Sequence, residues 1–521
     1  MREDLWKYTK VEGFEGGVNR DWASDNLKKN QHLTLKNVDL STQRGVAKRP
    51  GTERVTSAAL VDATEKVRSM HRYYQKDGDK YFLAQSGTKF FSINLGTGAA
   101  TQLATGLPEV DARCLTYNDI AYCFNSDASD TGFHKYTGAA WTSNISGGSI
   151  PAKGFTGGVI HEDKLFAWGD ADNPSYLYFS NAYAPETFSA GDVLRIRDDD
   201  GDKIRGACHF VGGQLLVLKD TSAWVISGSD GDSFSMKPAS DKVGLIGNTL
   251  QEVDGRPIWL SPLGVCWYNP YSANEPFRII SRDKINEELL AHSRAVLDAA
   301  VGKFIPRKNI YLLSLPTAST PTIYAFHLSI VAYSKDGRPF KTFPITNYEG
   351  VTVTAIETAD GAGDDGTAYW GELVGQISSC SDSVYTDNGA DIDIELQTGY
   401  LDLGLPDHHK RLDRLTVPVN IVGDTTNTVS VQIQKDWSAS ETVTQGALAS
   451  SDVLIWDQGK WDEKLWGSDA MVSNIRFRFH KVGFNKCSVI ITKSRDGRFS
   501  LHPFTLRWIV KNQRRWLEQA S

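Results

Sequence analysis

Cysteine is scarce in this chain of 521 residues, and its spacing is irregular. The six cysteines form no Cys-x-x-Cys pair; they are Cys114, Cys123, Cys208, Cys266, Cys380 and Cys487. This spacing is typical neither of a zinc cluster nor of a small domain held together by many disulfides. We therefore expect six buried thiols in a protein that is made in a reducing cytosol.

Long apolar runs are also missing. No window approaches the ~20 consecutive apolar residues that a membrane-spanning helix needs. The first residues lead through Trp6 into a polar stretch without the hydrophobic core of a secretion signal. We expect no membrane-spanning segment and no cleaved signal.

Local motifs for nucleotide binding and for serine hydrolysis are absent. The chain has no Walker loop, no Gly-x-Gly-x-x-Gly between a strand and a helix, and no Gly-x-Ser-x-Gly elbow. A glycosidase stays open, because its two carboxylates come together only in the folded chain. The acidic run 198–202 offers oxygen ligands to Ca²⁺ but lacks EF-hand spacing, which favours an acidic hairpin tip. We expect no metal and no cofactor.

Negative charge is concentrated in the middle of the chain, whose overall net charge is -7. Residues 1–55 hold 11 Lys and Arg against 8 Asp and Glu, and residues 391–521 hold 17 against 16. The remaining 28 basic and 39 acidic residues lie in 56–390, which gives that segment a charge of -11. A surface that grips DNA phosphates needs the opposite sign.

What the sequence does contain, from about residue 80 to residue 380, is a recurring hairpin pattern. A short β-branched or aromatic run is followed by a turn rich in Gly, Asp, Asn or Ser and then by another such run. The first runs of seven copies start at Tyr81, Ile120, Leu165, Leu215, Ile258, Ile310 and Ala368. This pattern predicts consecutive antiparallel strands.

The spacing of these copies favours a β-propeller. Successive starts lie 39 to 58 residues apart, which matches blades of ~40–50 residues with loop insertions. Seven hairpins fit six blades plus a closing or flanking hairpin, or seven blades, and we favour six. A β-sandwich or barrel built from unrelated hairpins is the alternative.

One helix interrupts the β pattern. Ser281 offers an N-cap, and apolar residues recur at near-helical spacing from Ile285 to Leu297. We expect one inserted helix near 283–301 that packs on the edge of the ring.

The segment 391–521 has longer alternating strands and no blade period. This alternation predicts an antiparallel β-sandwich with one wet face, followed by a basic C-terminal end. Within it, Trp456, Trp461 and Trp466 stand at intervals of five. Burial in the sandwich or at a neighbouring subunit would remove these rings from water.

The first 55 residues resemble neither a blade nor the sandwich, and we expect an arm that docks on another protein. Removing residues 1–51 is then expected to leave the propeller folded. The domain prediction is thus an arm over 1–55, a propeller over 56–390 and a sandwich over 391–521.

Several short motifs resemble the tail nozzle or hub proteins of short-tailed bacteriophages. Gly16-Gly17-Val18-Asn19, Asn37-Val38-Asp39-Leu40 and Lys48-Arg49-Pro50-Gly51 are similar to the "GGV…N…G…KRPG" arm that precedes a β-propeller in that family. The likeness continues through 173–180, 215–226, 244–247, 260–265 and the Trp-rich stretch at 456–466.

This resemblance implies a structural protein of the virion tail, made in the host cytoplasm and without catalysis. It implies a hexameric ring below the portal–adaptor complex that retains packaged DNA and conducts it during ejection. DNA would pass an acidic lumen without sequence-specific binding. The candidate residues for contacts with other subunits or the adaptor are Gly16, Gly17, Asn37, Lys48, Arg49, Pro50, Gly51, Trp456, Trp461 and Trp466. The alternative is a carbohydrate-active or glycan-binding propeller that acts on the host cell surface.

Overall fold

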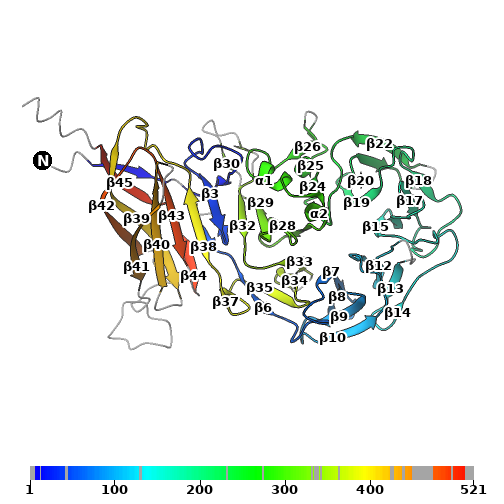
Figure 1. The fold of residues 1–521 in the computed structure, drawn as a ribbon. Coiled ribbons are helices and arrows are strands. Elements are labelled where there is room, and N and C mark those ends of the chain that lie inside the picture. The colour runs from blue at the N-terminus through cyan, green and yellow to red at the C-terminus, as the bar shows by residue number, and fades with distance from the viewer. Residues whose placement is uncertain are drawn as a thin grey trace, which may run out of the picture.

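The structure is a computed structural model in which nearly all regular elements are β-strands (Figure 1). It describes residues 6–11, 13–41, 45–127, 132–229, 233–272, 275–329, 332–333, 339–340, 343–361, 364–422, 427–436, 440–448, 473–493 and 497–510. The predicted fold class, an all-β chain with a β-propeller and a C-terminal β-sandwich, is confirmed.

Five blades of the propeller are separate antiparallel sheets of four strands each. In chain order these are β7 (Val67–Tyr74), β8 (Lys80–Ser86), β9 (Lys89–Asn94) and β10 (Ala100–Ala104); β11 (Arg113–Tyr117), β12 (Ile120–Phe124), β13 (Phe133–Tyr136) and β14 (Trp141–Thr142); β15 (Gly157–His161), β16 (Lys164–Trp168), β17 (Tyr176–Phe179) and β18 (Val193–Arg195); β19 (Ile204–Phe210), β20 (Gln214–Lys219), β21 (Ala223–Ser227) and β22 (Ser235–Ser240); and β23 (Gln251–Val253), β24 (Arg256–Ser261), β25 (Gly264–Tyr268) and β26 (Phe277–Ile279).

Two further four-stranded units complete the ring. One contains β33 (Val353–Ala359), β34 (Thr367–Glu372) and β35 (Ile377–Ser381), with β6 (Gly51–Arg54) as its fourth strand. The other contains β27 (Val301–Ile305), β28 (Ile310–Leu315), β29 (Thr322–His327) and β32 (Ile345–Tyr348), and its sheet continues into the second domain. The seven hairpins of the sequence therefore correspond to six separate blades and one shared unit.

The first strand of each unit lies at the centre of the ring, where it packs on the first strands of both neighbouring units (Figure 1). The ring closes between β33 and β7. Apolar side chains from facing sheets fill the space between neighbouring blades, as Phe166 and Leu177 do against Leu215 and Val217. This burial of alternate side chains explains why the hairpin runs are so rich in aromatic and branched residues.

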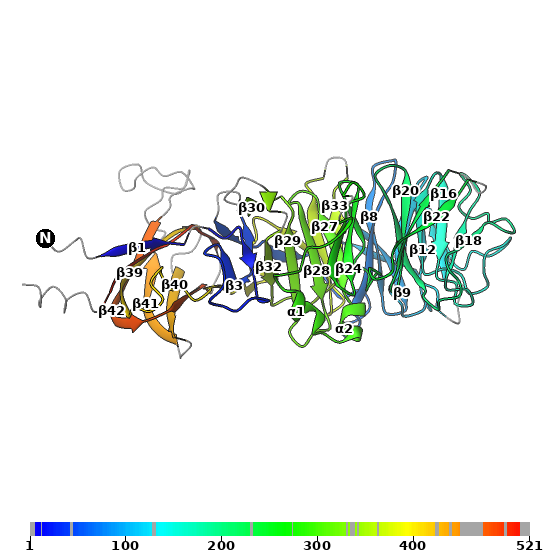
Figure 2. The ribbon, with the colours of Figure 1, turned by 90° about the horizontal axis from the view of Figure 1, so that it is seen from above.

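The second domain is a sandwich of two sheets that lies beside the propeller (Figure 2). One sheet has the order β1 (Lys7–Lys10), β45 (Thr505–Val510), β39 (Lys410–Val422), β44 (Arg498–Leu501), β5 (Val46–Lys48) and β4 (Val38–Leu40), and β42 (Ser473–Phe484) also pairs with β39. The other sheet continues from β32 through β3 (Gln31–Lys36), β38 (Ile394–Thr398), β43 (Cys487–Lys493), β40 (Asn427–Lys435) and β41 (Ser440–Leu448), and β2 (Gly17–Val18) pairs with β3. The remaining strands form two short hairpins: β30 (Ala332–Tyr333) with β31 (Pro339–Phe340), and β36 (Thr386–Asp387) with β37 (Ala390–Asp391).

The N-terminal segment is part of both domains, and its expected form as a separate docking arm is wrong. Strand β1 pairs with β45, and β3 pairs with both β32 and β38. Strand β6 supplies the outer strand of the blade that begins with β33. Removing residues 1–51 would leave residues 52–54 of β6 in place but would remove β3, which pairs with β32 of the shared unit, so the propeller would lose one of its strand contacts.

Two short helices replace the one helix that we expected near 283–301. They are α1 (Asn286–Leu290) and α2 (Arg294–Asp298). Ser293 between them has an extended backbone, with φ of -63° and ψ of 154°, which ends one helix and starts the next. The carboxylate of Asp21 accepts hydrogen bonds from the backbone N–H groups of Lys284, Asn286 and Glu287 at 2.9–3.0 Å. The N-terminal segment therefore caps α1 as well.

Two cysteines differ from the expected set of thiols. Cys114 and Cys123 lie opposite each other on β11 and β12 and form a disulfide. The other four cysteines are free. Burial raises the pKa of Cys266 well above the usual thiol value, and it raises the pKa of Cys487 to about 12.

Within the described residues, the structure contains no helix that is long and apolar enough to cross a membrane.

Candidate functional site

The N-terminal residues that the sequence singled out are buried inside the chain. Gly16, Gly17, Asn37, Lys48, Arg49 and Gly51 are buried, and Pro50 is half-buried. These residues contact other parts of the same chain. Their burial does not support a direct contact with another subunit. Trp456, Trp461 and Trp466 lie outside the described residues.

Arg49 is the centre of this region, and its side chain is fully buried. Its guanidinium forms a two-point ion pair with Asp387, with distances of 2.9 and 2.5 Å. The Nε group donates to the Asn37 side-chain oxygen at 3.0 Å, and the remaining N–H groups donate to the carbonyl oxygens of Pro50 and Glu349. All five donors of the guanidinium are therefore engaged, as a buried arginine requires.

Two aromatic rings complete this cluster, which we call the Arg49 junction (Asn37, Arg49, Tyr348, Trp370 and Asp387). The guanidinium carbon lies 5.6 Å from the centre of the Tyr348 ring and 5.7 Å from that of Trp370. Tyr348 belongs to the shared unit and Trp370 to the neighbouring blade. The cation thus binds two parts of the ring to the N-terminal segment.

Asn37 fits this position because of its backbone as well as its side chain. Its φ of 56° lies in the left-handed region, which Asn tolerates better than most residues. Its side-chain oxygen accepts the Arg49 bond and a second bond from the backbone N–H of Glu349 at 2.8 Å. Its side-chain nitrogen donates to the carbonyl oxygen of Asp393 at 2.7 Å, just before the sandwich strand β38.

Two glycines allow the chain to approach its neighbours closely. Gly17 has φ of +66°, and a Cβ there would lie 2.5 Å from the backbone nitrogen of Ile345. A Cβ at Gly51 would collide with the backbone of Thr386. The glycines of the arm motif therefore serve packing within the chain.

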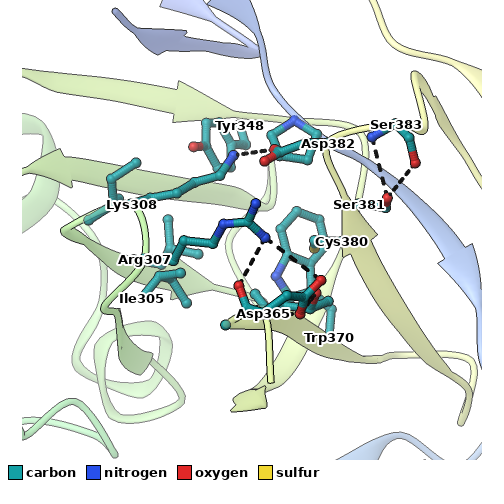
Figure 3. A pocket seen from close by; sticks show the side chains of 16 residues that line it. Ile305, Arg307, Lys308, Tyr348, Asp365, Trp370, Cys380, Ser381, Asp382 and Ser383 are labelled. Atoms are coloured by element: carbon teal, nitrogen blue, oxygen red, sulfur yellow. Dashed lines mark hydrogen bonds and ion pairs between the residues drawn. The ribbon is translucent and has the colours of Figure 1, made fainter. Parts of the chain in front are cut away.

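A cavity of about 250 Å³ lies next to the Arg49 junction, between the shared unit and the blade that contains β34 (Figure 3). Its apolar lining includes Ile305, Ile310, Leu312, Tyr348 and Trp370. Charged side chains stand around it, and they are paired. Arg307 lies 3.7 Å from Asp365, and Lys308 lies 2.8 Å from Asp382.

Lys308 also binds Asp39, at 3.2 Å. Burial would raise the pKa of Asp39, but Lys308, His327 and the Tyr348 hydroxyl outweigh it, and the pKa of this carboxyl is lowered. The Asp39 carboxylate is therefore ionised at neutral pH and holds Lys308 as a cation.

A second hollow, of about 610 Å³, is lined by first strands around the centre of the ring. In it the Lys303 ammonium lies 2.5 Å from Glu357, and a ring nitrogen of His71 lies 2.9 Å from the Thr116 hydroxyl. Burial and the nearby Lys303 and Arg72 lower the pKa of His71 to about 4, although Glu357 opposes this shift.

The pKa of Glu357 is lowered, because Lys303 and His71 outweigh the effect of its burial. A carboxylate held ionised in this way cannot donate a proton at neutral pH, as the general acid of a glycosidase must.

The acidic run 198–202 packs against a buried cation, Lys219 of β20. The buried ammonium of Lys219 binds the Asp200 carboxylate at 2.7 Å and the carbonyl oxygens of Ile196 and Arg197 at 3.0 and 3.1 Å. Asp202 accepts hydrogen bonds from the hydroxyls of Thr221 and Ser222 at 2.8 and 3.0 Å. Across the described ranges, no group of three or more His, Cys, Asp or Glu side chains is arranged to hold a metal ion.

Comparisons with known proteins identify no family. No family model matches the chain, and no curated protein matches it.

Among solved structures, the chain is similar to the extracellular domain of a one-component system from B. thetaiotaomicron, with 10% identity and a TM-score of 0.41 over 70% of this chain and 42% of that one. It is also similar to virginiamycin B lyase from Staphylococcus aureus, with 9% identity and a TM-score of 0.40 over 62% of this chain and 96% of that one. The Neurospora crassa Pan2 WD40 domain has 9% identity and a TM-score of 0.39 over 67% of this chain and 99% of that one.

None of these three is a phage tail protein. At such low similarity they carry no argument about the site or the function of this chain. The description of the propeller rests on the strand pairings themselves.

Proposed function

We propose that this chain is a structural subunit of a tail nozzle or hub of a short-tailed bacteriophage. In this proposal, a hexamer lies below the portal–adaptor complex, retains packaged DNA and conducts it during ejection. The observation that carries the proposal is that the residues of the resemblance share one structural task. Asn37, Arg49 and Gly51 tie the propeller, the sandwich and the N-terminal segment together around a single buried ion pair.

A conduit protein needs this kind of connection. It must keep its domains in fixed positions while DNA passes and while neighbouring proteins pull on it. An N-terminal segment that supplies strands to both domains resists their separation, because pulling them apart breaks ladders in several sheets at once. The charge of -11 over residues 56–390 supports passage of DNA without adhesion, since like charges repel.

The test is the assembly state of the purified protein, alone and mixed with candidate portal–adaptor complexes. We expect rings with six subunits in negative-stain electron microscopy, and a mass near 345 kDa for six chains of 57.5 kDa. Rings that form only on the adaptor would also agree with the proposal. A protein that stays monomeric and ignores every adaptor would contradict it.

A second candidate is binding or cleavage of glycans on the host cell surface. The observation in its favour is the 610 Å³ hollow at the centre of the ring, which Glu252, Glu357 and Asp360 line. The same purified protein can be tested for retention and hydrolysis of surface oligosaccharides. Binding that Glu357→Gln abolishes, in a protein that forms no rings, would favour this candidate over the first.

A further inference from the structure

The cavity next to the Arg49 junction has an apolar interior between two units of the ring. Residues from the end of β27, the strand β28 and the strand β34 line it, and the N-terminal segment contributes Pro50 (Figure 3). Its volume of about 250 Å³ lies just below the ~300–1,000 Å³ that is usual for sites of drug-sized ligands. A small molecule would therefore fill it.

One hydrogen-bond donor in the lining has no acceptor. Trp370 is 3% exposed, and its indole N–H has no hydrogen-bond partner among the residues that the structure describes. A buried donor without a partner destabilises the folded chain, and an acceptor that reached it would remove that cost. The indole cannot easily turn away to find another partner, because its ring packs against the fully buried guanidinium of Arg49.

The charges around the cavity do not call for a charged ligand. Arg307 faces Asp365, and Lys308 faces both Asp382 and Asp39. An additional anion or cation would have to displace one partner of these pairs. A neutral ligand leaves them intact.

We propose that this cavity binds a small neutral molecule, with an apolar ring or branched chain that fills the pocket and a carbonyl or ether oxygen that accepts the hydrogen bond of Trp370. The apolar part packs on Ile305, Ile310 and Leu312. This inference does not depend on the proposed function, because it rests on the cavity and its donor alone.

The experiment compares two neutral probes by ligand-observed saturation-transfer NMR and titration calorimetry. Acetanilide has an aromatic ring and a carbonyl oxygen, whereas ethylbenzene has the ring without an acceptor. We expect acetanilide to bind the full-length protein more tightly than ethylbenzene. Trp370→Phe keeps a ring but removes the donor, and should weaken acetanilide binding about three- to tenfold, the effect of one neutral hydrogen bond, without weakening ethylbenzene binding.

A matched control is available in another blade. Trp168 is also 3% exposed, and its indole N–H also lacks a partner, but it does not line this cavity. Trp168→Phe should therefore leave acetanilide binding unchanged. A second variant, Ala368→Leu, adds a side chain inside the cavity and should abolish binding of both probes while circular dichroism and melting temperature show that the fold persists.

Three results would overturn the inference. The first is no saturation transfer to either probe at millimolar concentration, which would mean that the cavity holds only water. The second is an equal affinity of wild type and Trp370→Phe for acetanilide. The third is a self-association of the protein that Ala368→Leu abolishes, because the occupant would then be a second copy of the chain.

Discussion

Arg49 and Asp387 are 338 residues apart in the sequence and form a two-point ion pair in the structure. The arginine lies between strands β5 and β6, and the aspartate lies on β36, beside β6. The arginine side chain is fully buried, and that of the aspartate is 12% exposed. The pair therefore connects the N-terminal segment to the last part of the propeller. Because both side chains are largely buried, solvent and salt weaken their attraction little.

Replacing Arg49 by Met should destabilise the protein by about 3–5 kcal/mol, because the change leaves the carboxylate of Asp387 and the side-chain oxygen of Asn37 without their partner. Urea unfolding at neutral pH measures this change in the free energy of unfolding. Arg49→Lys should recover only part of the loss, since an ammonium cannot supply the five donors of a guanidinium.

The control for this substitution is Arg54→Met, which removes the same charge from an exposed position on β6. We expect it to change the free energy of unfolding by no more than about 0.5 kcal/mol. Equal urea midpoints for the two variants would show that the buried pair contributes nothing to stability.

Two N-terminal deletions should differ in their effect on folding, because one removes a strand at the edge of the sandwich and the other also removes a strand where the ring closes. Deleting residues 1–10 removes β1, which among the described strands pairs only with β45, at the edge of its sheet. This protein should still melt cooperatively. Deleting residues 1–54 also removes β3 and β6, and should give an expanded, protease-sensitive protein, because β35 loses its partner where the ring closes. Size-exclusion chromatography and limited proteolysis measure both effects; a compact, resistant 1–54 deletion would contradict this prediction.

The hairpins were predictable from the sequence because their pairing is local. Runs such as Gly264–Tyr268 coincide with a strand, and each run pairs with its neighbour through a short turn. The positions of β1, β3 and β6 were not predictable, since these strands pair with residues hundreds of positions away and no local periodicity encodes that choice. The same holds for the cavity, whose donor Trp370 looks like an ordinary strand aromatic in the sequence.

The burial of the arm motif was not predictable from the sequence for a related reason. Polar and glycine-rich sequence suggested a segment that docks elsewhere, but Arg49 and Asn37 satisfy each other once buried. A polar residue with no partner nearby in the sequence can still be buried, because its hydrogen-bond partners come from distant parts of the chain. The extended backbone at Ser293 divides the expected helix into two. The helical spacing of the apolar residues gives no sign of this break.

Thiol titration should give four reactive groups in the denatured, unreduced protein and six after reduction. The four are Cys208, Cys266, Cys380 and Cys487, and the additional two come from the disulfide between Cys114 and Cys123. Free thiols at all six positions before reduction would mean that the pair on β11 and β12 is not oxidised. In the native protein, the raised pKa values of the buried thiols should make them react slowly, because the thiolate is the reactive form.

Acid should destabilise the protein through His32, a buried residue of β3 whose ring stacks on Phe14 with ring centres 4.7 Å apart. Burial lowers its pKa from 6.5 to about 3. Below pH 6.5 the unfolded chain therefore binds a proton that the folded chain does not. The stabilising contribution of the neutral ring is present above that pH and is lost as the pH falls toward 3, at about 1.4 kcal/mol per pH unit for one group.

Urea unfolding between about pH 6 and pH 4 checks this prediction. His32→Phe keeps a ring against Phe14 but cannot titrate, so its free energy of unfolding should depend on pH less steeply than that of the wild type, by about 1.4 kcal/mol per pH unit. Some slope should remain, because burial also lowers the pKa of His327 to about 4. His408→Phe makes the same substitution at an exposed position and serves as the control for the loss of a histidine as such. Identical slopes for wild type and His32→Phe would mean that His32 is protonated in the folded chain, and that the stack on Phe14 tolerates a charge.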